Sequence, residues 1–142
     1  MGLRDRGLGV VIRDASGALL AASVRRSKSL WNVDISKAYA AKFGVELAVR
    51  LGYRHVHLEG DALNVISKIA TGSLGATPIF LIYDGLFSIL EFVSDFNISF
   101  ARRGGNTLAH YVARWDVGNA TERVCMEPFP QGLSTLASLD LI

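Results

Sequence analysis

Two strand-like, mostly apolar runs, followed further along the chain by two stretches in which apolar and polar residues alternate, predict four β-strands. The stretches are 7–14 (GLGVVIRD), 18–25 (ALLAASVR), 55–60 (HVHLEG) and 95–102 (DFNISFAR). The first two are separated by a short segment with the turn signal Ser16-Gly17, and we expect them to form an antiparallel hairpin.

Apolar residues at helical spacing predict four helices between and after these strands. The first helix begins near Asp34 or Ser36, the two candidate caps, and ends at Gly52. Its apolar positions are Ala38, Ala41, Val45, Ala48 and Val49, and the other helices are expected over 61–70, 78–93 and 106–118. The order β-β-α-β-α-α-β-α predicts an α/β fold with a mixed sheet, in which a hairpin is followed by parallel strands joined through helices.

Asp61 stands where the strand over 55–60 meets the next helix, and its carboxylate has two possible roles. It can cap the helix by accepting hydrogen bonds from the first backbone N–H groups, which requires no function. Alternatively it belongs to a functional site, because ligands of α/β sheets gather at the carboxyl ends of strands. The local sequence favours capping.

Composition indicates a single domain with an ample core, because 50% of the 142 residues are hydrophobic and 20% are charged. The formal net charge of +2 gives no protein-wide field for a polyanion. The pairs Arg25-Arg26 and Arg102-Arg103 still leave room for a local basic patch. Composition therefore permits a nucleic-acid partner without requiring one.

The single cysteine, Cys125, excludes an internal disulfide and a zinc site built from several thiolates. We therefore expect an intracellular, reducing location, with nucleus and cytoplasm not distinguished. The first residues carry charges where a signal peptide needs an apolar core. The most apolar stretch, 76–93, is interrupted by Pro78, Asp84 and Glu91, which predicts a buried helix and no contact with a membrane.

Four segments, in this order and spacing, resemble the plant ribonuclease H-like domains related to reverse-transcriptase-associated RNase H. The segments are GLGVVIRDASGALLAA, AYAAKFGVELAVRLGYRHVHLEGDALNVISKI, FARRGGNTLAHYVAR and EPFPQGL. The resemblance extends over 7–133 and leaves 134–142 as a C-terminal tail. It implies an RNase H-like three-layer fold with a mixed central sheet, and a metal-dependent activity that cleaves RNA in an RNA–DNA hybrid.

The resemblance also implies a catalytic site of four carboxylates, which hold two Mg²⁺ or Mn²⁺ ions that activate water and stabilise the leaving oxygen. Asp61 matches the acid at the end of the family's fourth strand. Lys37 stands at the position of the acid in the first long helix, and His110 stands at that of the acid in the last helix. The first acid belongs to a strand before Gly7, where only six residues precede. One of the four acids is therefore found, so metal binding is doubtful.

The family's first strand is central in its sheet, and its absence here leaves backbone donors and acceptors without partners. Three interpretations remain open. The sequence is a truncated gene model or a fragment, or the hairpin closes directly onto the strand over 55–60. In the third, a partner or a second copy of the chain supplies the strand.

Lys37 and His110 each have a structural and a functional interpretation. Lys37 is either an exposed lysine, or its ammonium occupies the emptied metal site and pairs with Asp61. His110 is either a helix-face histidine bonded to a neighbour, or a ligand with Asp61 for a softer metal such as Zn²⁺ or Mn²⁺. His55 and His57 share one face of their strand and are expected to be sheet-surface residues.

Arg102, Arg103 and Asn106 occupy the loop that lies near the substrate in ribonucleases H. Arginines there are either ordinary surface residues or contacts to the phosphates of a hybrid or of RNA. The expected function is therefore an RNase H-like nucleic-acid-binding domain with impaired or absent catalysis. The alternative is a non-catalytic protein-interaction module on the same fold.

Overall fold

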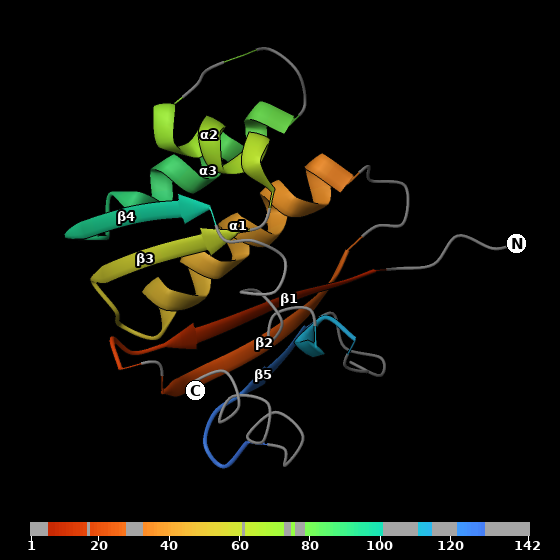
Figure 1. Ribbon diagram of the computed structural model, residues 1–142, viewed down its shortest axis with the longest axis vertical. Coiled ribbons are helices and arrows are strands. Elements are labelled where there is room, and N and C mark those ends of the chain that lie inside the picture. The colour runs from red at the N-terminus through yellow and green to blue at the C-terminus, as the bar shows by residue number, and fades with distance from the viewer. Residues whose placement is uncertain are drawn as a thin grey trace, which may run out of the picture. The chain divides into compact units, whose positions relative to one another are not determined.

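The computed structural model describes residues 6–16, 18–27, 33–60, 62–72, 75, 79–100, 111–114 and 122–129 (Figure 1). The chain divides into two compact units, one formed by Asn32–Asn106 and the other by Met1–Trp31 with Thr107–Ile142. The described residues contain three helices and five strands, and the strands form two hydrogen-bonded sheets. The α/β class predicted from the sequence is confirmed.

The predicted hairpin is present in the first of these sheets. Strand β1 (Arg6–Arg13) pairs antiparallel with β2 (Leu19–Ser27), with a register shift between Ile12 and Arg13. The carboxylate of Asp14 accepts hydrogen bonds from the backbone N–H groups of Ser16 and Ala18, each at 2.9 Å. A short polar side chain that satisfies two backbone donors closes the turn, as expected for aspartate in this position.

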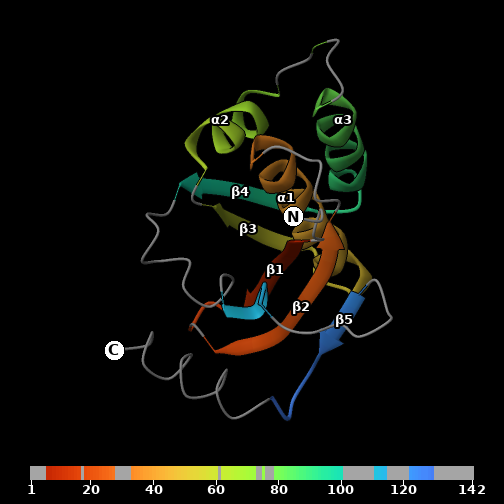
Figure 2. The same ribbon diagram turned by 90° about the vertical axis from the view of Figure 1, so that its right-hand side faces the viewer.

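A short strand that the sequence did not reveal, β5 (Glu122–Cys125), extends this sheet on the other side of β2 (Figures 1 and 2). The Ser23 hydroxyl donates to the carbonyl oxygen of Arg123 at 2.9 Å, and Arg25 pairs with Glu122 at 3.5 Å. The core of this unit contains Ala22, Val24 and Val112, with Val11, Leu19 and Phe129 packed against them.

The second unit begins with the long helix α1 (Val33–Arg50). The predicted helix is confirmed, but the predicted caps are wrong: Asp34 and Ser36 both lie inside it, because the helix already includes Val33. At the other end Gly52 adopts a φ of 90°, and its N–H donates to the carbonyl oxygen of Val49 at 3.0 Å. A positive φ suits glycine, and this turn reverses the chain into the following strand.

Strand β3 (His55–Gly60) and strand β4 (Asp95–Phe100) form a parallel pair, in register from His55 opposite Asp95 to Gly60 opposite Phe100. Parallel strands need a long crossover, which here contains α2 (Leu63–Thr71) and α3 (Ile79–Leu90). These elements confirm the strands and helices predicted over 55–102. Most of the helix predicted over 106–118 lies outside the described residues, which include helical Tyr111 and Val112.

All three helices cover the same face of the β3–β4 sheet (Figure 2). Their buried residues Ala38, Val65, Ile69, Tyr83 and Leu86 form one cluster with the strand residues Leu58, Phe96 and Ile98. Burying a side chain such as that of Leu86 contributes about 2 kcal/mol to folding. The cluster therefore holds the carboxyl ends of β3 and β4 in a fixed place beneath the helices.

None of the described helices is long and apolar enough to cross a membrane.

Candidate functional site

The carboxyl end of the β3–β4 pair is where the sequence predicted a functional aspartate. Gly60 ends β3 opposite Phe100, and α2 begins three residues further on at Leu63. Asp61 itself lies outside the described residues. The N-cap of α2 is Ala62, whose methyl group makes no capping hydrogen bond. The prediction that Asp61 occupies the cap is therefore wrong in position.

Gly60 allows α2 to approach the end of β3 closely. A Cβ atom at position 60 would lie 3.0 Å from Cδ1 of Ile66, which is tighter than an ordinary van der Waals contact. Ile66 is 7% exposed and sits in the second turn of α2, so it has little room to move away. The close packing fixes the start of α2 directly above the strand end.

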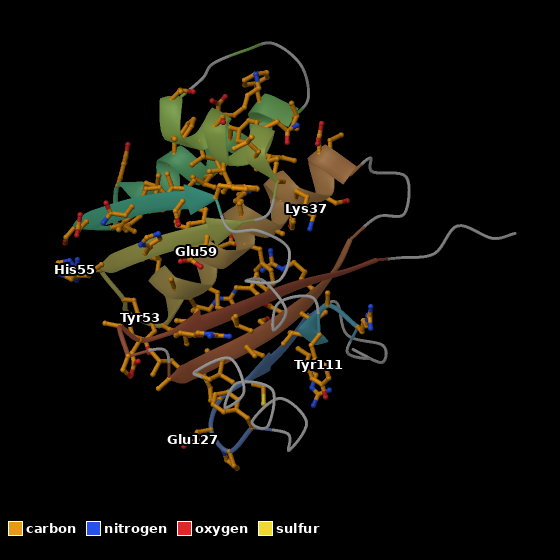
Figure 3. All side chains as sticks on the ribbon, viewed as in Figure 1. Lys37, Tyr53, His55, Glu59, Tyr111 and Glu127 are labelled. Atoms are coloured by element: carbon orange, nitrogen blue, oxygen red, sulfur yellow. The ribbon has the colours of Figure 1, made fainter. Side chains whose placement is uncertain are left out.

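Lys37 lies level with this strand end. It precedes the end of α1 by 13 residues, a rise of about 20 Å. Strand β3 returns in the opposite direction for six residues, an advance of about 16 Å from His55 to Gly60. Figure 3 accordingly shows Lys37 on the part of α1 toward the carboxyl end of β3, whereas His55 lies at the opposite end.

The environment of Lys37 is partly buried, and the residue takes part in at least one non-covalent interaction. An ammonium group has three donors and no lone pair, so it cannot ligate a metal ion. Its positive charge also repels a divalent cation nearby. The residue at this position therefore does not fit a magnesium site of the kind that the resemblance implies.

Polar groups of α1 and α3 lie near the first turn of α1. Tyr83 on α3 is 2% exposed, and burial raises the pKa of its phenol above the usual value, with a further contribution from the negative charge of Asp34. The Ser36 hydroxyl is buried and has no hydrogen-bond partner among the described residues. A phenol, a carboxylate and a buried hydroxyl group therefore lie near the first turn of α1.

Most of the predicted site residues lie outside the described part of the chain. These are Asp61, His110, Arg102, Arg103 and Asn106. Within the described ranges, no three histidine, cysteine, aspartate or glutamate side chains lie close enough to hold a metal ion. Lys37 is therefore the one predicted site residue whose surroundings the described residues reveal.

Sequence reasoning missed two exposed apolar side chains at this end of the sheet. Phe100, the register partner of Gly60, is 46% exposed, and Leu63 at the start of α2 is 59% exposed. Phe96, Ile98 and Phe100 alternate with polar residues in the sequence, so all three share one face of β4. Only the position of the covering helices decides which of them remains exposed.

The histidines expected on the sheet surface are confirmed there. His55 and His57 are exposed; His57 Nε2 lies 2.7 Å from the Ser99 hydroxyl, and His55 Nδ1 lies 3.9 Å from a carboxylate oxygen of Asp95. Both contacts join β3 to β4 across the face away from the helix-covered core. They have the geometry of ordinary cross-strand pairs.

Solved structures share this fold. RNase H1 from the halophilic archaeon Halobacterium salinarum matches with a TM-score of 0.67 and 18% identity, over 77% of this chain and 83% of that one. The N-terminal RNase H domain of a Mycobacterium tuberculosis protein, fused to maltose-binding protein, matches with a TM-score of 0.63 and 18% identity, over 77% and 88%. The chain therefore has an RNase H-like fold.

Comparison at the level of sequence gives the family. No curated protein matches the sequence significantly. The model of the reverse transcriptase-like family matches residues 2–116, which is most of the 142-residue chain and includes all of α1, β3, α2, α3 and β4. On the strength of this match, and with an RNase H-like fold, the chain belongs to the reverse transcriptase-like family.

Proposed function

We propose that this chain is a nucleic-acid-binding domain of the RNase H type that recognises an RNA–DNA hybrid or RNA and whose hydrolytic activity is impaired. Family membership supports the nucleic-acid ligand. The position of Lys37 is the observation that carries the impairment, because a cation stands level with the strand end where hydrolysis would need negatively charged metal ligands.

The proposal assigns roles to residues outside the described part of the chain. Asp61 is a vestigial catalytic acid, and its carboxylate pairs with the Lys37 ammonium, which takes the place of a metal ion. His110 occupies the position of a second acid without restoring a Mg²⁺ site, since imidazole is a poor ligand for Mg²⁺. Arg102, Arg103 and Asn106 contact phosphates.

The test measures cleavage and binding of a labelled RNA–DNA hybrid by the purified chain. With Mg²⁺ and then Mn²⁺ we expect no cleavage, together with binding whose log affinity falls linearly with log salt concentration. An Asp61→Asn variant is the control. Cleavage that this substitution abolishes would show that other residues complete the metal site, and the proposed impairment would be wrong.

A second candidate function, a protein-interaction module, is favoured by the two-stranded sheet. Among the described strands β3 pairs with β4 alone, and a further strand added beside β3 would extend this sheet. The natural polypeptide, a partner or a second copy would supply that strand. Light scattering over a range of concentrations, without nucleic acid, tests self-association; assembly without hybrid binding would favour this function over the first.

The free thiol of Cys125 is half-buried, and the chain holds no other cysteine. This supports the proposal of a reducing, intracellular location.

A further inference from the structure

Lys37 carries a positive charge that is held partly within the fold. Its side chain is partly buried, and the residue lies on the part of α1 toward the carboxyl end of β3 (Figure 3). Lysine side chains are usually exposed, because hydration and rotamer freedom favour an ammonium group in solvent. Partial burial restricts the Lys37 side chain and therefore confines its charge to the region near the strand end.

Lys42, on the same helix, has different surroundings. It follows Lys37 by five residues, which turns it by about 140° around the helix axis. A Cβ atom on Gly85 of α3 would lie 2.9 Å from Cε of Lys42, and the Lys42 ammonium lies 5.9 Å from the centre of the Tyr39 ring. The two lysines therefore have the same charge on one helix, but Lys42 lies against α3 and an aromatic ring.

A divalent metal ion at a site that cleaves phosphodiesters has two separable roles, which are to attract phosphate oxygens and to activate the attacking water. The Lys37 ammonium can take the first role, because it is a compact cation with three N–H donors and phosphate oxygens accept charge-assisted hydrogen bonds. It cannot take the second, since it has no coordination position for water. A lysine in place of a metal ligand thus permits binding of a phosphate while it prevents hydrolysis.

We infer that the Lys37 ammonium donates to a phosphate of the nucleic-acid ligand, so that the chain binds this ligand without a divalent cation. The inference rests on the nucleic-acid binding proposed above and states how the ligand's charge is balanced. Lys37 takes part in an interaction within the chain; because the ammonium has three donors, it can keep such a contact while it donates to a phosphate oxygen. The misfit between Lys37 and a magnesium site then has a consequence for ligand binding as well as for catalysis.

The experiment measures binding of a labelled RNA–DNA hybrid by fluorescence anisotropy, in EDTA and in Mg²⁺ at matched ionic strength. We expect the affinity in EDTA to be at least as high as in Mg²⁺, because the cation is only a competitor for the phosphates. Binding that requires Mg²⁺ and is lost in EDTA would overturn the inference and leave the proposed nucleic-acid binding intact. Absence of binding in both solutions would overturn both.

Variants of Lys37 test whether this residue supplies the charge. In EDTA, Lys37→Gln should weaken binding about tenfold and reduce the slope of log affinity against log salt concentration by about one. Lys37→Arg, which keeps the charge, should retain most of the affinity and the slope. Lys37→Glu should bind more weakly still in EDTA and should be strengthened by Mg²⁺, the opposite of the unmodified chain.

Lys42→Gln is the matched control, because it removes the same charge from the same helix. It should keep the affinity and the salt slope of the unmodified chain, and circular dichroism establishes that each variant is folded. Equal affinities and slopes for Lys37→Gln and the unmodified chain would overturn the role of Lys37. Equal losses in Lys37→Gln and Lys42→Gln would also overturn it, since the effect would then follow net charge alone.

Discussion

The two ends of the β3–β4 pair are built from different chemistry. At the amino end, exposed polar side chains meet across the strands, as His55 meets Asp95, and the backbone N–H groups of Ser94 and Asp95 both donate to the carbonyl oxygen of Arg54. At the carboxyl end, a glycine admits a helix at close range, a lysine stands level with the strand end, and an aromatic ring remains exposed.

This difference indicates which end of the sheet has features that folding alone does not require. At the amino end, exposed polar side chains pair with neighbours across the two strands, and any exposed parallel sheet can form such weak pairs. The carboxyl end combines tight packing at Gly60 with the cation of Lys37 and the ring of Phe100. Such combinations of constraint and exposed chemistry are typical of functional sites.

The largest effect is expected where the packing is tightest. Gly60→Val would place side-chain atoms where Cδ1 of Ile66 lies, and such overpacking destabilises a fold by about 1 to 3 kcal/mol. Urea denaturation measures the loss as a lower midpoint. In an Ile66→Val background, which lacks that Cδ1 atom, the same substitution should cost less. An equal loss in both backgrounds would contradict the close-packing explanation.

Lys37→Glu tests the electrostatics of the same end. Replacing a cation by a carboxylate should raise the affinity for Mg²⁺ at least about tenfold, because repulsion is replaced by attraction and by a hard oxygen ligand. Isothermal titration calorimetry gives the affinity. Lys42→Glu, with the same change of charge on the same helix, is the control and should have no such effect. Equal Mg²⁺ affinities for all three proteins would remove the role assigned to Lys37.

Tyr83→Phe addresses the buried phenol that senses Asp34 near the start of α1. Because the folded pKa of Tyr83 is raised above 10.0, the native chain keeps the phenol proton at a pH where the unfolded chain releases it. Stability should therefore fall as the pH rises from about 10 toward the folded pKa. Unfolding midpoints measured across this range should fall less steeply in Tyr83→Phe. Parallel curves for the two proteins would contradict the raised pKa.

The smallest effect is expected at the amino end. The side chains of His55 and Asp95 are 79% and 62% exposed, and Nδ1 of His55 lies 3.9 Å from a carboxylate oxygen of Asp95. Such an exposed pair contributes less than about 0.5 kcal/mol to stability. His55→Ala should leave the thermal midpoint nearly unchanged. A loss comparable with that of Gly60→Val would abolish the contrast between the two ends.

Elements with a clear period were predictable from the sequence. The apolar runs in β1 and β2, the alternation in β3 and β4 and the helical spacing in α1, α2 and α3 placed each element within a few residues. Strand β5 was missed since its four residues, Glu-Arg-Val-Cys, show no alternation and its place depends on pairing with β2. Helix caps were also missed, because Ala62 carries no capping signal.

The site was predictable only in part. Resemblance to a family singled out Lys37 and Asp61. Because α1 and β3 run in opposite directions, Lys37 lies level with the carboxyl end of β3, the strand that Asp61 follows. The exposure of Phe100 was not predictable, because its row on β4 reads as uniformly apolar and only the extent of the helical cover distinguishes its last member. The raised pKa of Tyr83 likewise depends on burial between elements distant in sequence.

The parallel pairing of β3 with β4 also governs the order in which the molecule can assemble. Its partners His55 and Asp95 are 40 residues apart, whereas Arg13 and Leu19 of the hairpin are six apart. Closing the longer loop costs roughly 1.7 kcal/mol more in chain entropy. Local hairpins form in microseconds, and distant pairings follow more slowly. A nascent chain therefore acquires its hairpin before it acquires the junction of Gly60 and Phe100, and its capacity to recognise a ligand there arises last.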